Sequence, residues 1–392
     1  MANEIEALVA SVRQLTGAED LTQAYATVDR WNRESRTGDL LGLAAELERA
    51  CDVSGAAKLP YEAVADHVEE VLALTAGPDH IDALLTLLSK ERVRSVQRPR
   101  PLEMRVRAFA SRLGHGQTQD ALVAAITRAG NKAEHTEILA CWMHETVLRG
   151  TALDRESAAV AFHAKLAERR HPLGGMPLVL LEAEAEAPTY MPMYGANAIQ
   201  KAVQRLERGP SSTRTMPPPG EQAAPVATRI ENAAVEQRMR DAVGPWTTGS
   251  NGKSEAKVFS LAPVVTTSSP GKWLLRALPL DCLEGAAALR AERSGADAVW
   301  GALFAAAANG GAYSSGLGAA YGRRAAWTSL AALIDAPADA SPAQIDERAQ
   351  TATFLMFGAS GGWWHDVAWD IGALAVREGG ASAAVLAATD TD

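Results

Sequence analysis

Apolar residues recur at spacings of three and four along the first half of the chain, and Gly or Pro interrupts the pattern at short intervals. Stretches such as DLLGLAAELERAC, from Asp39, and EILACWMHETVL, from Glu137, have the period of amphipathic helices. Short connections between such helices are typical of antiparallel neighbours. We therefore predict an all-helical N-terminal domain over residues 1–208.

Part of this helical pattern repeats along the chain. IDALLTLL at Ile81 aligns with QDALVAAI at Gln119 at an offset of 38 residues, and a fainter copy, SAAVAFHA, follows at Ser157. Helical pairs of similar length build solenoids, in which each pair buries its apolar face against the next pair. The pattern leaves two arrangements open, a solenoid-like array of repeats and an irregular helical bundle.

The periodic pattern stops in ERGPSSTRTMPPPGEQAAPVATR, residues 207–229. Its density of Pro and Ser opposes a helix and offers few side chains to bury. We predict a linker or a long surface loop over residues 209–229.

A different pattern follows the linker. KVFSLAPVV, from Lys257, is short and β-branched, and Pro263 predicts a strand at a sheet edge. GADAVWGALFAAAANGG, GLGAAYGRRAAWTSLAALI and PAQIDERAQTATFLMFG then predict three helices, the first ending at a Gly pair and the last preceded by Ser341 as its N-cap.

VAWDIGALAV and ASAAVLAA flank a turn that contains Gly, which is the pattern of a β-hairpin. We predict an α+β domain over residues 230–392 with a small sheet, its final hairpin packed on the helices around Trp300 and Trp327. The fold class is mainly α.

Composition narrows the classes of function. The formal charge of −9 argues against a dedicated nucleic-acid binder, which needs a basic surface. The run from Lys90 to Arg107 is basic, but no aromatic residue that could stack on bases interleaves it, so we interpret it as a solvated turn. Nucleic acid is therefore not an expected partner.

Cysteine use and the N-terminus bear on the compartment. Cys51, Cys141 and Cys282 lie far apart without CxxC spacing, so neither a disulfide framework nor a zinc knuckle is indicated. Glu4 and Glu6 stand where a signal peptide carries basic residues, and no stretch of 18 apolar residues occurs. We expect a soluble cytoplasmic protein that does not enter a membrane.

The densest polar and aromatic stretch is WWHDVAWD, from Trp363 to Asp370. In a strand, Asp366 and Asp370 share one face about 13 Å apart, too far for an acid–base pair. In a helix they lie one turn apart and close enough to share a cation. We favour the strand. His365 beside Asp366 could form a base with its carboxylate, although adjacent strand residues point to opposite faces.

Arg323 falls within the apolar sector of the predicted helix from Leu317 to Ile334. A buried guanidinium must reach a carboxylate or an anion, and Asp366 and Asp370 are the candidate partners. The favoured interpretation is a structural ion pair. The alternative is an anion site formed by Arg323, Arg324 and the preceding glycines, which lack the strand context of a nucleotide loop.

HTEILACWMHE places His144 and Glu145 about one turn after Cys141, and His135 two turns before it. Such a set could bind a transition metal, but an ordinary amphipathic helix explains it equally well. We predict neither a metal site nor a cofactor.

Three blocks, GGAYSSGLGAAYGRRAAWTSLAAL, WWHDVAWDIG and VLAATDTD, resemble an uncharacterised family of actinobacterial proteins, a domain of unknown function. The resemblance is specific over residues 311–392 and faint over the helical half. It implies a cytoplasmic bacterial protein and one structural unit formed by the three blocks, and it carries over no catalytic residues.

The sequence favours a non-catalytic binding or scaffold protein, because the helical domain offers an extended surface for a protein partner. The alternative is an enzyme, or a protein that binds a small anionic ligand, with Arg323, Arg324, His365, Asp366 and Asp370 as ligand-binding candidates. The sequence leaves the partner and the oligomeric state open.

Overall fold

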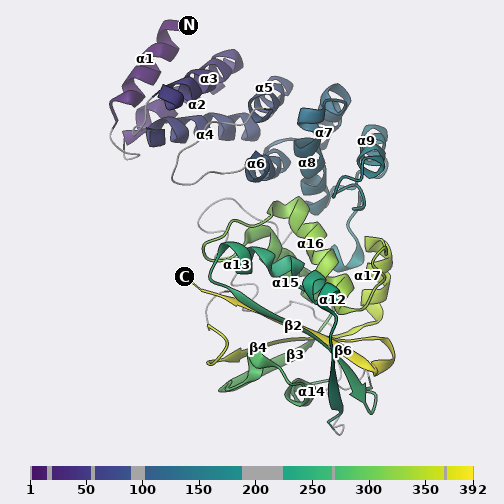
Figure 1. The fold of residues 1–392 in the computed structure, drawn as a ribbon. Helices are drawn as coiled ribbons and strands as arrows, with labels where there is room; N and C mark the ends of the chain where they lie inside the picture. The colour runs from purple at the N-terminus through teal and green to yellow at the C-terminus, as the bar shows by residue number, and fades with distance from the viewer. Residues whose placement is uncertain are drawn as a thin grey trace. The chain divides into compact units, whose positions relative to one another are not determined.

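The computed structural model describes residues 2–15, 20–53, 58–89, 102–187, 224–266, 270–365 and 369–391 (Figure 1). Contacts divide the chain into two compact units, Met1–Thr146 with Leu153–Lys165, and Val147–Ala152 with Leu166–Asp392. We call them the helical unit and the α+β unit. The predicted boundary near residue 208 lies outside the described residues, and the described segment after residue 165 belongs to the α+β unit.

The helical unit contains amphipathic helices that bury large aromatic residues, among them Trp31, Tyr61 and Trp142. Its elements are α1 (Ala2–Arg13), α2 (Thr22–Arg33), α3 (Thr37–Val53), α4 (Lys58–Leu74), α5 (Pro78–Leu88), α6 (Leu102–Gly116), α7 (Gln119–Ala129), η2 (Ala133–His135), α8 (Thr136–Leu148) and α9 (Ser157–Glu168), the last two crossing the border of the unit. The predicted helical N-terminal region is confirmed.

The three aligned copies fall on helices α5, α7 and α9. Leu84 and Leu122 occupy the same position of the first two copies and both are buried. Val160 occupies that position in the third copy and is 42% exposed. The first two copies therefore share a burial pattern that the third does not follow, and true helical repeats stay a prediction.

The α+β unit is built on one six-stranded antiparallel sheet with the strand order β1-β2-β6-β5-β4-β3. The strands are β1 (Val226–Ile230), β2 (Lys253–Ala262), β3 (Ala288–Ser294), β4 (Thr353–Ser360), β5 (Trp369–Val376) and β6 (Ser382–Asp390). The helices are α12 (Ala233–Arg240), α13 (Gly244–Gly249), α14 (Lys272–Ala277), α15 (Ala296–Asn309), α16 (Gly318–Leu333) and α17 (Pro342–Thr351), with short turns η3 (Glu182–Glu184), η4 (Asp241–Val243), η5 (Asp281–Leu283) and η6 (Glu378–Gly380).

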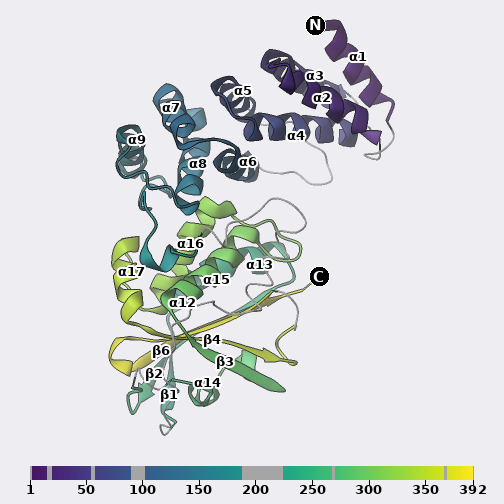
Figure 2. The same cartoon turned by 180° about the vertical axis from the view of Figure 1, so that it is seen from behind.

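Both faces of the sheet are covered. α12, α15 and α16 pack on one face, whereas α14 lies on the other (Figures 1 and 2). Side chains alternate between these layers: Val385 and Ala387 of β6 join the core beneath α14, and Leu386 between them points to the helical layer. The antiparallel sheet therefore has two apolar faces, which explains the nearly continuous apolar run of β6.

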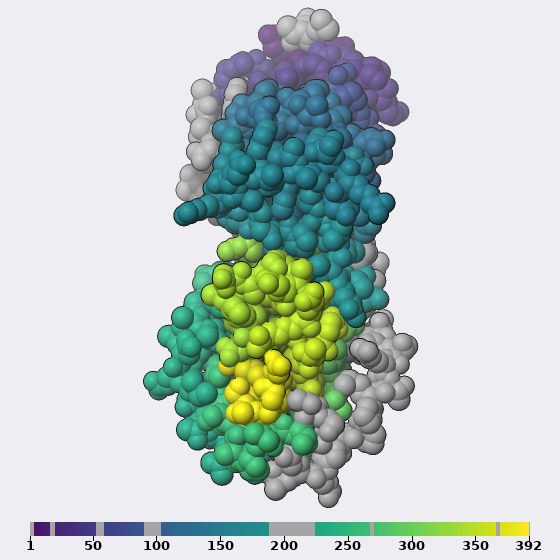
Figure 3. All heavy atoms as spheres, turned by 90° about the vertical axis from the view of Figure 1, so that its right-hand side faces the viewer, coloured from purple at the N-terminus to yellow at the C-terminus, as the bar shows by residue number. Residues whose placement is uncertain are grey.

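The final hairpin is confirmed, and its turn is anchored to the helical layer. Arg377, directly after β5, donates hydrogen bonds to the carbonyl oxygens of Leu333 (3.1 Å) and Ala332 (3.0 Å) at the end of α16. Nearby, Nη2 of Arg348 in α17 lies 3.7 Å from Oε2 of Glu378. Figure 3 shows the yellow C-terminal segment at the surface beside the yellow-green segment that precedes it. The hairpin thus packs on the helix that contains Trp327, as expected.

Two strand predictions need correction. The strand around Lys257 is β2, which pairs with β1 and β6 and is not an edge. Pro263 follows its last residue, so the missing N–H interrupts no ladder position. The edge strand on this side of the sheet is β1, whose residues 226–229 fall in the predicted linker. Five alternating residues behind a Pro-rich stretch gave too weak a strand pattern to detect.

The helix that begins at Pro342 is shorter than predicted. It ends at Thr351, and the next residues form β4 from Thr353 to Ser360. Thr, Phe and Met in this stretch suit a pleated surface, and its buried positions partly alternate. β3 was also missed, because its charged residues resemble a solvated turn.

The stretch that begins at Trp363 is only partly a strand. Residues 361–363 form a turn, residues 364–365 have no regular structure, and β5 begins at Trp369. Asp366 and its two successors lie outside the described residues. The favoured strand is therefore confirmed only from Trp369 onward. The predicted pairing of faces between Asp366 and Asp370 is not described.

Candidate functional site

Arg323 is fully buried in α16 and binds a carboxylate of the same unit. Its Nε and Nη2 donate to the two carboxylate oxygens of Glu184, each at 2.7 Å. Nη1 and Nη2 also donate to the carbonyl oxygens of Pro177 and Val179, both at 2.8 Å. This bidentate geometry compensates the cost of burying both charges.

The segment that carries Glu184 is itself held from two sides. Trp327, one turn after Arg323, donates its indole N–H to Glu184 at 2.6 Å. Asp346 of α17 accepts hydrogen bonds from the backbone N–H groups of Glu182 (2.8 Å) and Ala183 (3.0 Å). These N–H groups lie at the start of η3, where the helical turn itself offers them no acceptor. The ion pair therefore joins α16 and η3, and Asp346 ties η3 to α17.

The carboxylate that binds Arg323 was not among its predicted partners, and one of those partners, Asp366, lies outside the described residues. The structure shows an ion pair with Glu184, whereas Asp370 accepts a hydrogen bond from Thr389 at 2.5 Å. Helical periodicity reveals that Arg323 needs a buried counter-charge, but it carries no information about which distant carboxylate supplies it. Glu184 stands in a short turn without periodicity, so the sequence offered no signal for it.

Arg324 is exposed on the same helix. It acts electrostatically on Asp241, where burial raises the pKa of the carboxyl group and Arg324 opposes that rise. Arg323 is buried and Arg324 is exposed, so the two side chains have different surroundings, and a joint anion site stays a prediction.

At one end of the sheet, polar groups from separate segments meet. Thr389 of β6 donates to Asp370 of β5 and accepts from the backbone N–H of His365 at 3.2 Å. The side chain of His365 is exposed. This arrangement brings two of the predicted residues together through a threonine, without Arg323.

Asp390, the last residue of β6, is buried beside the glycine-rich loop between α15 and α16. One carboxylate oxygen accepts the backbone N–H of Ala312 at 2.7 Å, and the other has no hydrogen-bond partner among the described residues. A side chain at Gly311 would collide with this carboxylate and crowd the ring of Trp246. Gly311 is therefore needed for close approach, and neither the sequence periodicity nor the spacing predicted Asp390 as its neighbour.

Backbone N–H groups of this glycine-rich loop bind protein oxygens. Gly311 donates to Ser314 Oγ (2.9 Å), Tyr313 to Ser250 Oγ (3.0 Å), and Leu317 to the carbonyl of Ala307 (2.8 Å). These are the donors that a phosphate-binding loop would present to its ligand. Their use within the fold favours a structural connection between α15 and α16.

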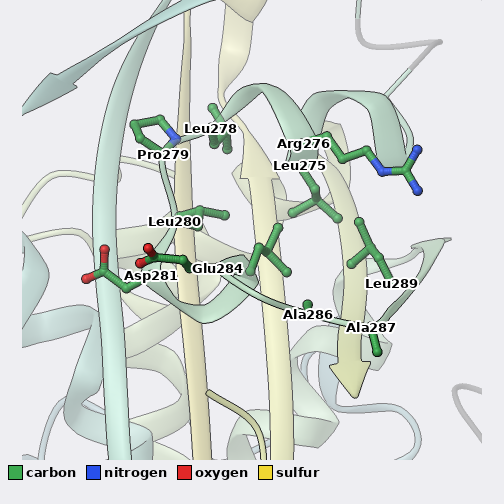
Figure 4. A pocket seen from close by; sticks show the side chains of 11 residues that line it. Leu275, Arg276, Leu278, Pro279, Leu280, Asp281, Glu284, Ala286, Ala287 and Leu289 are labelled. Atoms are coloured by element: carbon green, nitrogen blue, oxygen red, sulfur yellow. The ribbon is translucent and has the colours of Figure 1, made fainter. Parts of the chain in front are cut away.

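A pocket of about 490 Å³ lies between α14, η5 and β3 (Figure 4). Five leucines form its apolar wall, and three charged residues, Arg276, Asp281 and Glu284, belong to its lining; the leucines are Leu275, Leu278, Leu280, Leu283 and Leu289. Asp281 and Glu284 lie together on one side in Figure 4, whereas Arg276 extends away from them. The pocket combines apolar walls with an acidic side.

A buried carboxylate fixes this wall. Glu255 of β2 accepts the backbone N–H groups of Asp281 (2.9 Å) and Cys282 (2.7 Å) at the start of η5. Nζ of Lys257 lies 2.6 Å from Oε1 of Glu255 and 2.9 Å from Oδ1 of Asp281. Burial alone would lower the pKa of Lys257, but hydrogen bonds to both carboxylates outweigh it and raise that pKa. The sequence analysis missed Glu255, since a lone acidic residue in a strand gave no signal.

Cys282, beside this wall, and Cys141, in the helical unit, are poor nucleophiles. Burial raises the pKa of the Cys282 thiol well above its usual range, and burial does the same to Cys141 in α8. A thiol held neutral is neither a good nucleophile nor a good metal ligand. Among the residues that the structure describes, no group of three or more His, Cys, Asp or Glu residues could hold a metal ion.

The basic run is partly outside the described residues, from Lys90 to Pro101. Its end lies in α6, where Arg105 is buried and forms an ion pair with Glu69 of α4. The interpretation of this stretch as a solvated turn is therefore wrong for Arg105, because α6 extends back to Leu102.

Residues 22–392 match the model of a family of unknown function, DUF6183. The chain belongs to this family. The match covers nearly the whole chain, so a resemblance restricted to residues 311–392 was too narrow. The chain matches no curated protein and no solved structure. In the described part of the chain, every helix is too short or too polar to cross a membrane.

Proposed function

We propose that the protein is a non-catalytic binding or scaffold protein of an actinobacterial cytoplasm, with another protein as its partner. The observation that supports this most is the engagement of Arg323 with Glu184 and two carbonyl groups. The buried guanidinium of Arg323 thus stabilises the fold. An enzyme built around it would need those donors directed at a substrate.

The pocket between α14 and β3 is the proposed contact in the α+β unit. Its leucine wall suits an apolar side chain of the partner, and the acidic side formed with Glu284 suits a neighbouring basic residue. A short peptide segment that carries both residue types fits this chemistry. The helical unit, with the exposed Leu59 and Leu74, is the second proposed surface for the partner.

A peptide selection tests this function. Random peptides displayed on phage would be selected on the immobilised full-length protein, and their binding to the variant Ala287→Trp would then be measured. Ala287 is an exposed residue of the pocket lining, so a Trp at this position fills the pocket. Ala338→Trp, at an exposed alanine outside the pocket, is the matched control. We expect peptides with an apolar and a basic residue that bind the wild type and the control but lose at least tenfold in affinity on Ala287→Trp.

A second arm separates the two surfaces. Leu74→Lys places a charge on an exposed apolar position of the helical unit. Peptides that lose affinity only for Leu74→Lys would show that the partner binds the helical unit and not the pocket. If no peptide distinguishes any variant from the wild type, the binding function proposed here is wrong.

The alternative function is an enzyme or an anionic-ligand protein around Arg323, His365, Asp366 and Asp370. The linkage of Asp370 and His365 through Thr389 is the observation that favours it. It is the weaker proposal, because the described hydrogen bonds of Arg323 go to residues 177–184.

A further inference from the structure

β1 is an edge strand of the sheet that exposes apolar side chains. Val226 is 72% exposed and Ile230 is 40% exposed, and Thr228 between them is exposed on the same face. On its other side β1 pairs with β2 over five residues. Its outer backbone groups can therefore receive another strand, and β-branched side chains favour such pairing.

The opposite edge of the sheet differs. β3 carries the exposed charged residues Arg290 and Glu292 in its outward-facing row. Charged side chains on an edge strand oppose pairing with a further strand. β1 has no such protection on its exposed face, so the two edges of one sheet are not equivalent.

The sequence of β1 is complementary to itself under a two-fold axis. If two copies pair antiparallel about Thr228, Val226 of one copy lies opposite Ile230 of the other, and Thr228 lies opposite its own counterpart. On the other face, Ala227 then lies opposite Arg229, so the two Arg229 residues do not face each other. Arg229 already binds Glu236 at 2.5 Å, which balances its charge.

We propose that two copies of this chain associate through antiparallel pairing of β1 with β1, which joins their sheets into one continuous sheet. The pairing adds cross-strand contacts between β-branched residues and satisfies backbone groups at both edges. Five residues a side bury less area than a standard stable interface. The dimer is therefore weak and depends on protein concentration, and it is independent of the peptide-binding function proposed above.

Cysteine crosslinking tests the register. At the two-fold axis the paired Cα atoms are about 4.5–5.5 Å apart, within the range that a disulfide spans. Thr228→Cys in the full-length protein should therefore form a disulfide-linked dimer under mild oxidation. Ile230→Cys, exposed on the same face but about 13 Å from its counterpart in this register, should not. The native cysteines Cys51, Cys141 and Cys282 are buried and give little background.

Sedimentation over a concentration series tests the association without crosslinking. We expect wild-type protein to shift from monomer toward dimer at rising concentration. Ile230→Lys should weaken this association at least tenfold, because it places a charge opposite Val226 of the other copy. Val160→Lys, at an exposed apolar position of the helical unit, is the control and should leave the association unchanged.

Dimers crosslinked through Thr228→Cys but not Ile230→Cys, together with a loss of association in Ile230→Lys, support the proposal. Equal crosslinking at both positions, or crosslinking only through Ile230→Cys, overturns it. A wild type that stays monomeric at all concentrations, or a dimer that Ile230→Lys leaves intact, overturns it as well.

Discussion

Each unit contains a buried Arg–Glu pair, and the two pairs connect very different parts of the chain. In the helical unit Arg105 of α6 binds Glu69 of α4, 36 residues away. In the α+β unit Arg323 of α16 binds Glu184 of η3, 139 residues away. The first joins helices that are close in sequence, whereas the second closes a long stretch of chain.

The comparison shows that the same kind of buried ion pair joins segments that are close in sequence and segments that are far apart. A buried pair contributes little compared with well-packed apolar residues, but breaking it leaves an isolated charge in the interior. The local pair can form as soon as two helices pack. The distant pair needs η3, α16 and Trp327 in place together, so it reports on the completed fold of its unit.

The largest predicted effect is that of Arg323→Ala. It leaves Glu184, two carbonyl groups and the Trp327 indole N–H to rearrange, and we expect a loss of about 3–5 kcal/mol in the free energy of unfolding. Thermal unfolding with and without nucleotides and phosphorylated metabolites measures it. Early melting with no ligand response fits a structural pair.

A phosphorylated compound that raises the melting midpoint of the wild type by several degrees, but not that of Arg323→Ala, would instead show a ligand site. The double variant Arg323→Met with Glu184→Met is the control. Removing both charges together should restore most of the lost stability, because no unpaired charge remains.

Arg105→Ala should cost about 3 kcal/mol, and its effect should be confined to the helical unit. Because the two pairs lie in separate compact units, hydrogen exchange should speed up in α4 and α6 and stay slow in β5 and β6. Uniformly faster exchange in both units would contradict the independence of the two pairs.

Trp327→Phe removes only the indole N–H that Glu184 accepts. We expect a cost of about 1.5–3 kcal/mol, typical of a hydrogen bond to a charged group. Denaturant unfolding measures it, with Trp300→Phe as the control, because the indole N–H of Trp300 has no hydrogen-bond partner in the described part of the chain. A larger loss in the control would mean that ring packing, and not the hydrogen bond, sets the effect.

The smallest predicted effect is a pH dependence of the helical unit. Burial lowers the pKa of His80 and of His135 below the usual value of 6.5. Below pH 6.5 these histidines therefore bind protons more readily in the unfolded chain than in the folded one. The stability that the neutral histidines contribute is present above pH 6.5, and it is lost as the pH falls from 6.5 through their lowered pKa values.

Unfolding of the helical unit followed between pH 7.5 and about 5 measures this loss. His80→Asn with His135→Asn should flatten the dependence. A wild type whose stability does not change over this range would contradict the expectation.

The sequence predicted the helices and the last hairpin, because each of these patterns is local. Arg323 was also recognised as buried, since its position on α16 follows from helical periodicity. Its partner Glu184 and the contact between Gly311 and Asp390 could not be predicted. They depend on chain segments that meet only in the tertiary structure, and neither carries a periodic pattern.

β3 and β4 show a second limit. In β3, charged residues alternate with partly buried ones on an exposed edge, and this pattern resembles a turn. β4 follows α17 with only Ala352 between them, so its apolar residues read as a continued helix. Neighbouring strands, and not the local sequence, select the extended conformation there.

The position of β6 has a consequence for synthesis on the ribosome. β6 lies between β2 and β5, although it is the last strand in the chain. β2 ends at Ala262, and its inner neighbour begins only at Ser382. Until the ribosome releases that segment, β2 lacks its inner neighbour and α15 lacks part of the sheet beneath it, so the nascent α+β unit exposes an unpaired strand until β6 is made.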